Sequence, residues 1–272
     1  MDNKKLELTA NEVRKGIVSA VHAAKAGHPG GSLSSADILT YLYFEEMKNI
    51  DPADPKRPDR DRFVLSKGHA APVLYSTLAE RGYFPKEDLL TLRRIDSYLQ
   101  GHPDMEKVPG VDMSTGSLGQ GFSTAVGMAL AGKMDGADYR VYAVMGDGEI
   151  QEGQIWEAAM FAGSRKLDNL VAIVDNNGLQ IDGKISDVCD PNPIDKKFEA
   201  FNFHVIHADA HDFDSIRKAF DEARATKGMP SAIIAKSVKG KGVSYMENNA
   251  GWHGKAPSDE EYQQAMSELE MK

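Results

Sequence analysis

The sequence predicts an α/β fold in which helices cover both faces of a mainly parallel sheet, a three-layer α/β/α arrangement. The strongest indication is a strand, helix and strand unit between Tyr139 and Gly183. The runs Val141 to Met145 and Leu170 to Val174 have the length and composition of buried strands. Between them, apolar residues recur at helical spacing: Ile155, Ala158, Ala159 and Ala162. Such a βαβ unit implies parallel strands.

Length and composition support one domain over residues 1–272. The chain has 41% hydrophobic and 27% charged residues, and no repeat, linker or low-complexity tract divides it. A net charge of −9 disfavours nucleic-acid and anionic-membrane partners. The only cysteine, Cys189, excludes an internal disulfide. The polar start MDNKKLELTANEV and the lack of a run of 18 apolar residues predict a cytoplasmic protein.

The amino-terminal half is expected to open with a helix from Thr9 to Ala26, because Thr9 and Glu12 form a capping box and Gly27 follows. A tight loop from His28 to Ser32 comes next. Ser34 or Ser35 should cap a second helix that runs to Met47. A short strand from Phe63 to Leu65 follows, and a further helix begins near Ala71.

The remaining elements follow from the same patterns. Residues 97–116 have no periodicity, and their apolar anchors favour an ordered loop. A helix of small residues is expected over 123–132, and residues 187–201 look irregular. The later predictions are strands at 203–207 and 232–237, a helix at 214–226, and a final helix capped by Ser258 to Glu260.

Polar residues follow both strands of the βαβ unit, at the edge where open α/β sheets bind ligands. Gly146 and Gly148 let backbone approach a ligand, and amides from about Glu149 to Glu152 offer donors to an anion. Asp147 and Asn177 offer a carboxylate and an amide oxygen to a hard cation such as Mg²⁺. The sequence therefore predicts a metal-bridged diphosphate site, although GDG and DNNG are also ordinary turn sequences.

At these residues the chain resembles transketolase. GDG followed about thirty residues later by NN is similar to the thiamine diphosphate motif. Words similar to those of transketolase occur in the same order between about Glu12 and Asp259: GHPGGSLSSAD, LSKGHA, QGHPD, STGSLGQG, GDGEIQEGQIWEAAMFAG and WHGKAP. The resemblance implies the thiamine diphosphate-binding fold and transfer of a two-carbon ketol unit between sugar phosphates.

The resemblance also assigns the cofactor residues. Asp147, the side chain of Asn177 and the carbonyl of Leu179 would bind Mg²⁺ or Ca²⁺. The residues expected to contact thiamine diphosphate are His69, Gly116, Ser117, Leu118, Gly146, Gly148, Glu149, Asn177 and His253.

Four histidines and one glutamate are the expected catalytic residues. A histidine taken alone is more often structural, but His28, His69, His102 and His253 each lie beside glycine in a predicted loop, where catalytic residues concentrate. Their local words match the transketolase pattern, and imidazole suits proton transfer near neutral pH. The same resemblance places Glu152 toward the cofactor and a subunit contact.

The chain is similar only to about the first two-fifths of a full transketolase. The pyrimidine-binding domain and a third domain are expected on a partner chain, in an α2β2 heterotetramer. Two alternatives remain open. One is a related enzyme, either a split transketolase-like protein for an unusual sugar phosphate or a 2-oxo acid dehydrogenase α subunit, and the other is a non-catalytic thiamine diphosphate-binding module.

Overall fold

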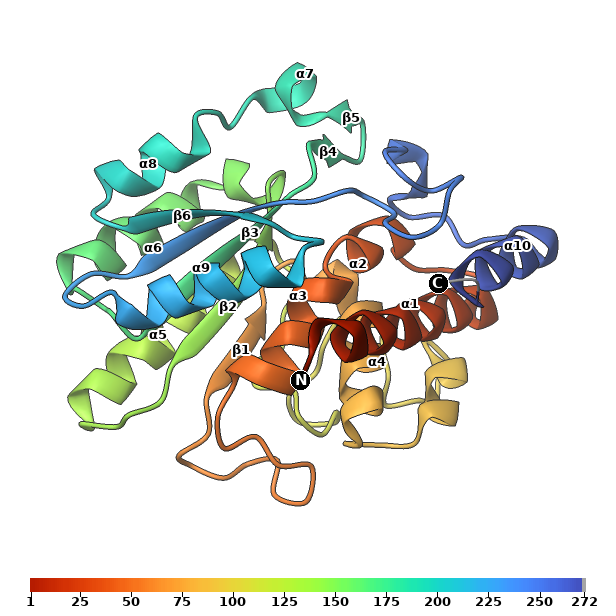
Figure 1. Ribbon diagram of the computed structural model, residues 1–272, viewed down its shortest axis with the longest axis horizontal. Coiled ribbons are helices and arrows are strands. Elements are labelled where there is room, and N and C mark those ends of the chain that lie inside the picture. Colours follow the sequence, from red (N-terminus) through yellow and green to blue (C-terminus); the bar gives the residue numbers. More distant parts are fainter. Residues whose placement is uncertain (271–272) are drawn as a thin grey trace.

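A five-stranded, fully parallel sheet forms the centre of the protein, in the strand order β1-β2-β3-β7-β6 (Figure 1). The computed structural model describes residues 1–270. The strands of this sheet are β1 (Arg62–Leu65), β2 (Val141–Gly146), β3 (Leu170–Asn176), β6 (His204–Asp209) and β7 (Ser231–Lys236). A small hairpin follows β3 and consists of β4 (Leu179–Gln180) and β5 (Gly183–Lys184).

Helices account for most of the remaining regular structure. They are α1 (Asn3–Ala24), α2 (Pro29–Leu33), α3 (Ala36–Tyr41), α4 (Ala71–Arg81), α5 (Gln120–Met134), α6 (Gly153–Ser164), α7 (Ile185–Cys189), α8 (Ile194–Ala200), α9 (Phe213–Ala225) and α10 (Asp259–Glu270). A π-helical turn over 42–46 extends α3, and 3₁₀ turns cover 68–70, 86–91, 149–151 and 250–252.

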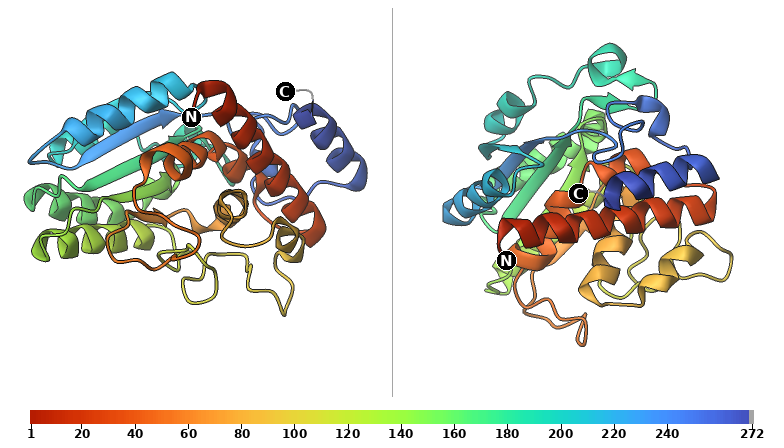
Figure 2. Two further views of the ribbon diagram at one scale, coloured as in Figure 1. Left: turned by 60° about the horizontal axis from the view of Figure 1, so that its bottom comes forward. Right: turned by 45° about the vertical axis from the view of Figure 1, so that its right-hand side comes forward.

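The alternation of side chains along the strands produces the three layers. Tyr142 and Val144 of β2 face a core shared with α1, α3, α4 and α9. The intervening Val141, Ala143 and Met145 face a second core, shared with α5, α6 and α8. The sheet therefore lies between two helical layers, as Figure 2 shows, and the predicted three-layer arrangement is confirmed.

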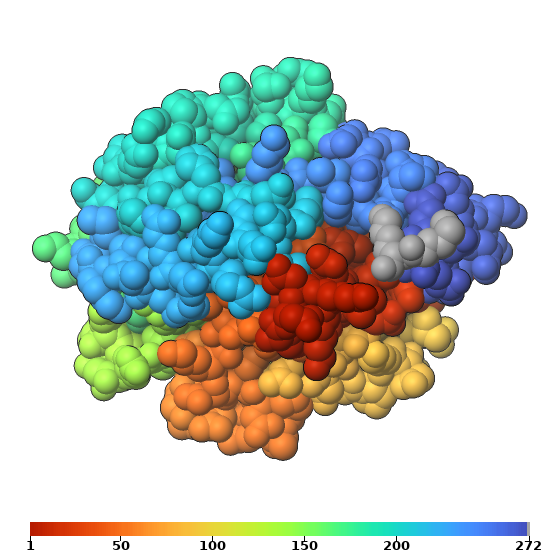
Figure 3. Space-filling view, viewed as in Figure 1, coloured from red at the N-terminus to blue at the C-terminus, as the bar shows by residue number. Residues whose placement is uncertain are grey.

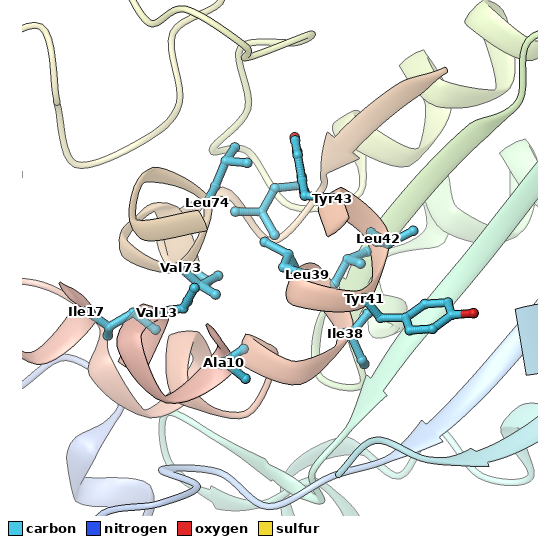
Figure 4. Packing of buried hydrophobic residues seen from close by; sticks show 14 of the residues in the cluster. Ala10, Val13, Ile17, Ile38, Leu39, Tyr41, Leu42, Tyr43, Val73 and Leu74 are labelled. Carbon is cyan, nitrogen blue, oxygen red and sulfur yellow. The ribbon is translucent and has the colours of Figure 1, made fainter. Parts of the chain in front are cut away.

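The first core is where α1, α3 and α4 meet. Figure 4 shows Val13 and Ile17 of α1, Leu39 of α3 and Val73 of α4 directed toward one another. All four side chains are completely buried. This packing fixes the two segments that leave α1 and β1, which carry His28 and His69 respectively.

The predicted start of the first helix was wrong. The helix begins at Asn3, and its N-cap is Asp2, whose carboxylate accepts a hydrogen bond from the Lys5 amide at 2.8 Å. Thr9 lies inside the helix and donates its hydroxyl hydrogen to the Lys5 carbonyl. The helix ends at Ala24, where Lys25 adopts a left-handed conformation. An acidic N-cap earlier in the chain outcompetes the capping-box pattern.

Three other local predictions also needed correction. The expected loop at 28–32 contains the short helix α2, which Pro29 begins at a position where proline is favoured. Ser35 occupies the N-cap position of α3, but it makes no capping hydrogen bond. The segment expected to be irregular after Gly183 contains α7 and α8. In contrast, the βαβ unit, α4, α9 and the Ser258 cap of α10 are confirmed.

The two ends of the described chain lie side by side. In Figure 3 the red N-terminal helix lies against the blue C-terminal segment. Tyr262 of α10 stacks on His22 of α1 with ring centroids 4.2 Å apart, and Asn11 donates a hydrogen bond to the Leu269 carbonyl. Among residues 1–270, none of the helices combines the length and the apolar character that crossing a membrane requires.

Candidate active site

The candidate site lies at the carboxyl ends of four adjacent strands. His69 follows β1, Asp147 follows β2, Asn177 follows β3 and Lys239 follows β7. Parallel pairing brings all four of these ends to one edge of the sheet, although the residues span more than half of the chain. His28 and the 97–119 loop complete the site from outside the sheet.

Asp147 and the loop after β3 are directly connected. One carboxylate oxygen of Asp147 accepts the Gly148 amide at 2.9 Å, and the other accepts the Gly178 amide at 2.5 Å. The side-chain oxygen of Asn177 accepts the Leu179 amide at 3.1 Å. The Asp147 carboxylate and the Asn177 amide oxygen therefore accept consecutive amides of one turn, so the two predicted oxygen ligands lie close together although they come from different loops.

Asp147 is a buried acid without a full counter-charge. Its side chain is 1% exposed, and burial together with the charge of Asp175 raises the pKa of its carboxyl to about 7. A hard cation beside this carboxylate would favour its ionised form. Within residues 1–270 there is no cluster of three or more His, Cys, Asp or Glu side chains that could hold a metal.

Asp175 organises the floor of the site, a role that the sequence did not reveal. Its Oδ2 atom accepts hydrogen bonds from Lys67 at 2.6 Å, from Ser34 at 2.7 Å and from Asn177 at 3.2 Å. Burial opposes ionisation of Asp175, but the Lys67 ammonium and the bound hydroxyls outweigh it and lower the pKa to about 2. The carboxylate thus joins the ends of β1 and β3 to the segment before α3.

Two buried lysines also emerged only from the structure. Lys67 and Lys239 are each 2% exposed, although lysine is rarely buried. Lys239 approaches His253, with 3.2 Å between Nζ and Nδ1. Burial and the charge of Lys67 lower the pKa of Lys239 to about 8. Lys67 is already paired with Asp175, so the positive charge that a diphosphate needs comes chiefly from Lys239, and a hard cation fits the oxygens of Asp147 and Asn177.

Three of the four predicted histidines form one cluster. The ring centroids of His28, His69 and His253 lie 5.2 to 5.3 Å apart in every pairing. Burial, followed by the charge of Arg93, lowers the pKa of His28 to about 4, and burial with Lys239 lowers that of His253 to about 4. The pKa of His69 also falls well below its usual value, chiefly through burial. All three imidazoles are therefore neutral near pH 7, and each offers one donor and one acceptor.

His102 lies beside this cluster on the 97–119 loop. A Cβ atom on Gly116 would lie 3.1 Å from the His102 ring, so the loop backbone passes close to the imidazole. Burial and then Arg93 lower the pKa of His102. Arg93, another residue that the sequence did not single out, packs its guanidinium against Gly101. A pocket of about 560 Å³ opens here, lined by Arg93, Gln100, Gly101, His102, Pro103, Asp104 and Ser114.

The predicted Glu149 has a side-chain role that differs from the expected amide contact. Its buried carboxylate accepts hydrogen bonds from the Ser66 hydroxyl at 2.5 Å, the Gly119 amide at 2.9 Å and the Gly146 amide at 3.1 Å. It thereby joins the loops after β1 and β2 to the start of α5. Ser66 and Glu149 are both buried, so Glu149 holds the loops in register.

The other predicted positions lie around this network. A Cβ atom on Gly146 would meet nothing closer than 3.8 Å, whereas one on Gly148 would lie 3.1 Å from Gln180. Ser117 and Leu118 lie just before α5, where Ser117 is exposed and Leu118 is partly exposed. Glu152 occupies the exposed N-cap position of α6, next to Gly119 and outside the three-histidine cluster.

The chain matches the family model described as transketolase, thiamine diphosphate binding domain, over residues 6–272. It is 48% identical over 265 residues to a subunit of 6-deoxy-6-sulfo-D-fructose transketolase from a Clostridium species, covering 97% of this chain and 96% of that protein. It is 45% identical over 269 residues to a subunit of apulose-4-phosphate transketolase from Phocaeicola vulgatus, covering 99% of this chain and 95% of that protein.

A solved transketolase from Campylobacter jejuni superimposes with a TM-score of 0.92 at 35% identity. The match covers 99% of this chain but 43% of that enzyme. These comparisons confirm the expected transketolase class and the thiamine diphosphate-binding fold. The chain belongs to the transketolase family, as a member built around its thiamine diphosphate-binding domain.

Proposed function

We propose that this chain is the thiamine diphosphate-binding subunit of a two-subunit transketolase. The observation that carries the proposal is the bond from the Gly178 amide to the Asp147 carboxylate, next to Asn177. It joins the loop after β2 to the loop after β3 at one oxygen-rich point of the sheet edge. The cofactor's diphosphate would bind there through a divalent cation, Mg²⁺ or Ca²⁺.

The site supplies separate groups for the cation and for the phosphates. The proposed cation ligands are the side chains of Asp147 and Asn177 and the carbonyl of Leu179. Lys239 adds a buried positive charge, whereas the charge of Lys67 is paired with Asp175. The buried Oε1 atom of Gln180 has no hydrogen-bond partner within the described residues. Together these groups fit a charged, oxygen-rich ligand better than an apolar one.

The histidines are proposed to handle the sugar. When bound, thiamine diphosphate supplies the carbanion that carries a two-carbon unit. His28 and His253 are neutral, partly buried and 5.3 Å apart between ring centroids, so they can donate to and accept from substrate hydroxyls. The Nδ1 atom of His28 is buried without a hydrogen-bond partner among residues 1–270, so its hydrogen-bonding capacity is unused there. His69 and His102 would line the same space.

The substrate and the partner are inferred from the names of the relatives. Two relatives of similar length are named as subunits of transketolases for a sulfonated and a phosphorylated sugar. We propose a comparable anionic sugar for this chain. The pyrimidine-binding and C-terminal domains would be provided by a partner chain, as an α2β2 assembly in the cytoplasm, and the predicted subunit contact of Glu152 would face that partner.

The experiment is calorimetric titration of the chain with thiamine diphosphate and Mg²⁺, comparing wild type with Asp147→Asn. Removing the carboxylate should weaken cofactor binding by about 100-fold or more, because a charged metal ligand is lost. Asp138→Asn, at an exposed surface acid, serves as the matched control and should bind like wild type. Equal affinity for the Asp147 variant and the control would refute the assignment.

The histidine cluster bears on the alternatives. Three neutral imidazoles in mutual contact, two of them beside buried lysines, are costly to maintain without a ligand, which speaks against a non-catalytic module. The family match favours transketolase over a 2-oxo acid dehydrogenase α subunit. The proposal includes an unusual sugar as the substrate, because the two relatives of similar length are named for 6-deoxy-6-sulfo-D-fructose and for apulose-4-phosphate.

A further inference from the structure

A second buried charged cluster lies on the other side of the segment that carries Lys239. It consists of Asp37 of α3, Arg14 of α1 and His211 of the loop between β6 and α9, and we call it the Asp37 cluster. The Oδ2 atom of Asp37 lies 2.5 Å from Arg14 and 2.7 Å from His211 Nδ1. Asp37 and Arg14 are 5% and 8% exposed.

Arg14 and His211 of this cluster also bind the segment 237–241. The Val238 amide donates to His211 Nε2 at 2.9 Å, and Arg14 Nε donates to the Lys241 carbonyl at 3.2 Å. The Asp37 carboxylate therefore binds Arg14 and His211, and these two side chains bind the backbone on either side of Lys239. Because the Val238 amide must find an unprotonated acceptor, His211 is fixed as the neutral tautomer with its proton on Nδ1.

The same segment is held from the side of the site. The Gly240 amide donates to the Gly30 carbonyl at 3.0 Å, and Ser237 donates to Asp175. Space around it is tight, since a Cβ atom on Gly30 would lie 3.1 Å from Lys239 Cγ and 2.8 Å from the Trp252 carbonyl. A small displacement of residues 238–241 would therefore move Lys239 relative to its partner His253.

We propose that Asp37, Arg14 and His211 are positioning residues, which hold the segment 237–241 so that Lys239 faces His253 and the bound cofactor. The inference rests on the proposed function for the cofactor contact, but the restraint on the segment is a property of the chain itself. The contacts of the Asp37 cluster with this segment are to the Val238 amide and the Lys241 carbonyl, so its effect on Lys239 passes through the backbone.

Two substitutions of His211 separate its two hydrogen bonds. His211→Gln keeps an acceptor near Nε2 for the Val238 amide, whereas His211→Asn keeps a donor near Nδ1 for Asp37 and loses that acceptor. His207→Asn is the matched control, because His207 lies four residues away with its side chain 68% exposed. All variants are made in the full chain, and circular dichroism checks that each is folded.

The first readout is amide hydrogen exchange of the peptide covering residues 237–241. Loss of one hydrogen bond should speed exchange in His211→Asn by about 10-fold, while His211→Gln stays within about twofold of wild type. Nitrogen-15 spectra of wild type should show the Nδ1-protonated tautomer of His211. Equal exchange in the Asn and Gln variants, or an unchanged Asn variant, would overturn the inference.

The second readout is the affinity for thiamine diphosphate and Mg²⁺, which should fall by about 10-fold in His211→Asn and be restored in His211→Gln. If the wild-type chain does not bind the cofactor, the proposed function is refuted. Hydrogen exchange then still decides whether the Asp37 cluster restrains the segment 237–241. Normal binding by His211→Asn despite faster exchange would show that the restraint does not position the cofactor contact.

Discussion

The low pKa values of the clustered histidines have a measurable effect on stability. His28 and His253 titrate near pH 4 in the folded chain but near 6.5 when unfolded. Between these values the unfolded chain binds more protons, so the free energy of unfolding should rise with pH from about 4 to 6.5 and then level off. His28→Asn should reduce that slope by up to about 1.4 kcal/mol per pH unit, and by less where solvent screens the half-buried ring. Urea unfolding of wild type and His28→Asn at a series of pH values measures how the free energy of unfolding depends on pH.

His207→Asn provides the control for this titration, because His207 is exposed and lies outside the cluster. It should leave the pH dependence of the free energy of unfolding as in wild type. A slope that is the same in wild type and His28→Asn would show that the His28 ring is solvated in solution and not buried as described.

Arg93 offers a test of how an anionic sugar is recognised. Its guanidinium lies against Gly101 next to His102, it lowers the pKa of His28, and it forms no ion pair within residues 1–270. With the partner present, Arg93→Gln should raise KM for a sugar phosphate by about 10-fold and change kcat much less. Arg94→Gln, at the adjacent exposed arginine, is the control. A similar effect of both variants on KM would indicate general loss of surface charge.

The sequence was sufficient to predict some residues of the candidate site but not its buried lysines, and the reason is physical. Asp147 and Asn177 were selected because they follow predicted strands, whereas the histidines in the glycine loops were selected only with the help of the resemblance to transketolase. Lys67 and Lys239 were not selected, because nothing in a KGHA or KGKG word shows that the ammonium is buried. Burial of a lysine depends on contacts with Asp175 and His253, which are distant in sequence.

Among the elements, α6 contains two glycines with opposite surroundings. A Cβ atom on Gly163 would overlap the Phe201 carbonyl oxygen, whereas one on Gly153 would meet nothing within 4 Å. Gly163→Ala should therefore force backbone apart and lower the free energy of unfolding by about 1–3 kcal/mol. Gly153→Ala should change it by no more than about 0.5 kcal/mol. Equal urea midpoints for the two variants would contradict this packing.

Elements with a long periodic pattern of apolar residues were predicted well. Helix ends and helices of only one or two turns were not. The βαβ unit was placed almost to the residue, because buried strands and an amphipathic helix leave independent signals. The predicted start of α1 was wrong because Asp2 and Thr9 both match an N-cap, and the contacts of Asn3 with Asp214 and Arg217 of α9 favour the longer helix. The short helices α7 and α8 lack a continuous apolar stripe and were missed.

For the assembled enzyme, the main prediction concerns the domains expected on the partner. Two relatives of similar length are named as transketolase subunits, so the isolated protein is expected to show no ketol transfer. Adding the proposed partner chain should restore activity and give a mass in light scattering that corresponds to two copies of each chain. The assay is coupled turnover of a sugar phosphate pair. Sustained activity of the isolated chain would exclude a requirement for the partner.

The parallel sheet has a further consequence for biosynthesis. His28 lies before α2 and His253 lies after β7, and the two meet at one edge of the sheet. Both residues must therefore have been synthesised before the histidine cluster can form. The N-terminus leaves the ribosome first, so the cluster stays incomplete until the segment after β7 has emerged. Binding of the proposed cofactor at this cluster is therefore expected only when translation of the domain is nearly finished.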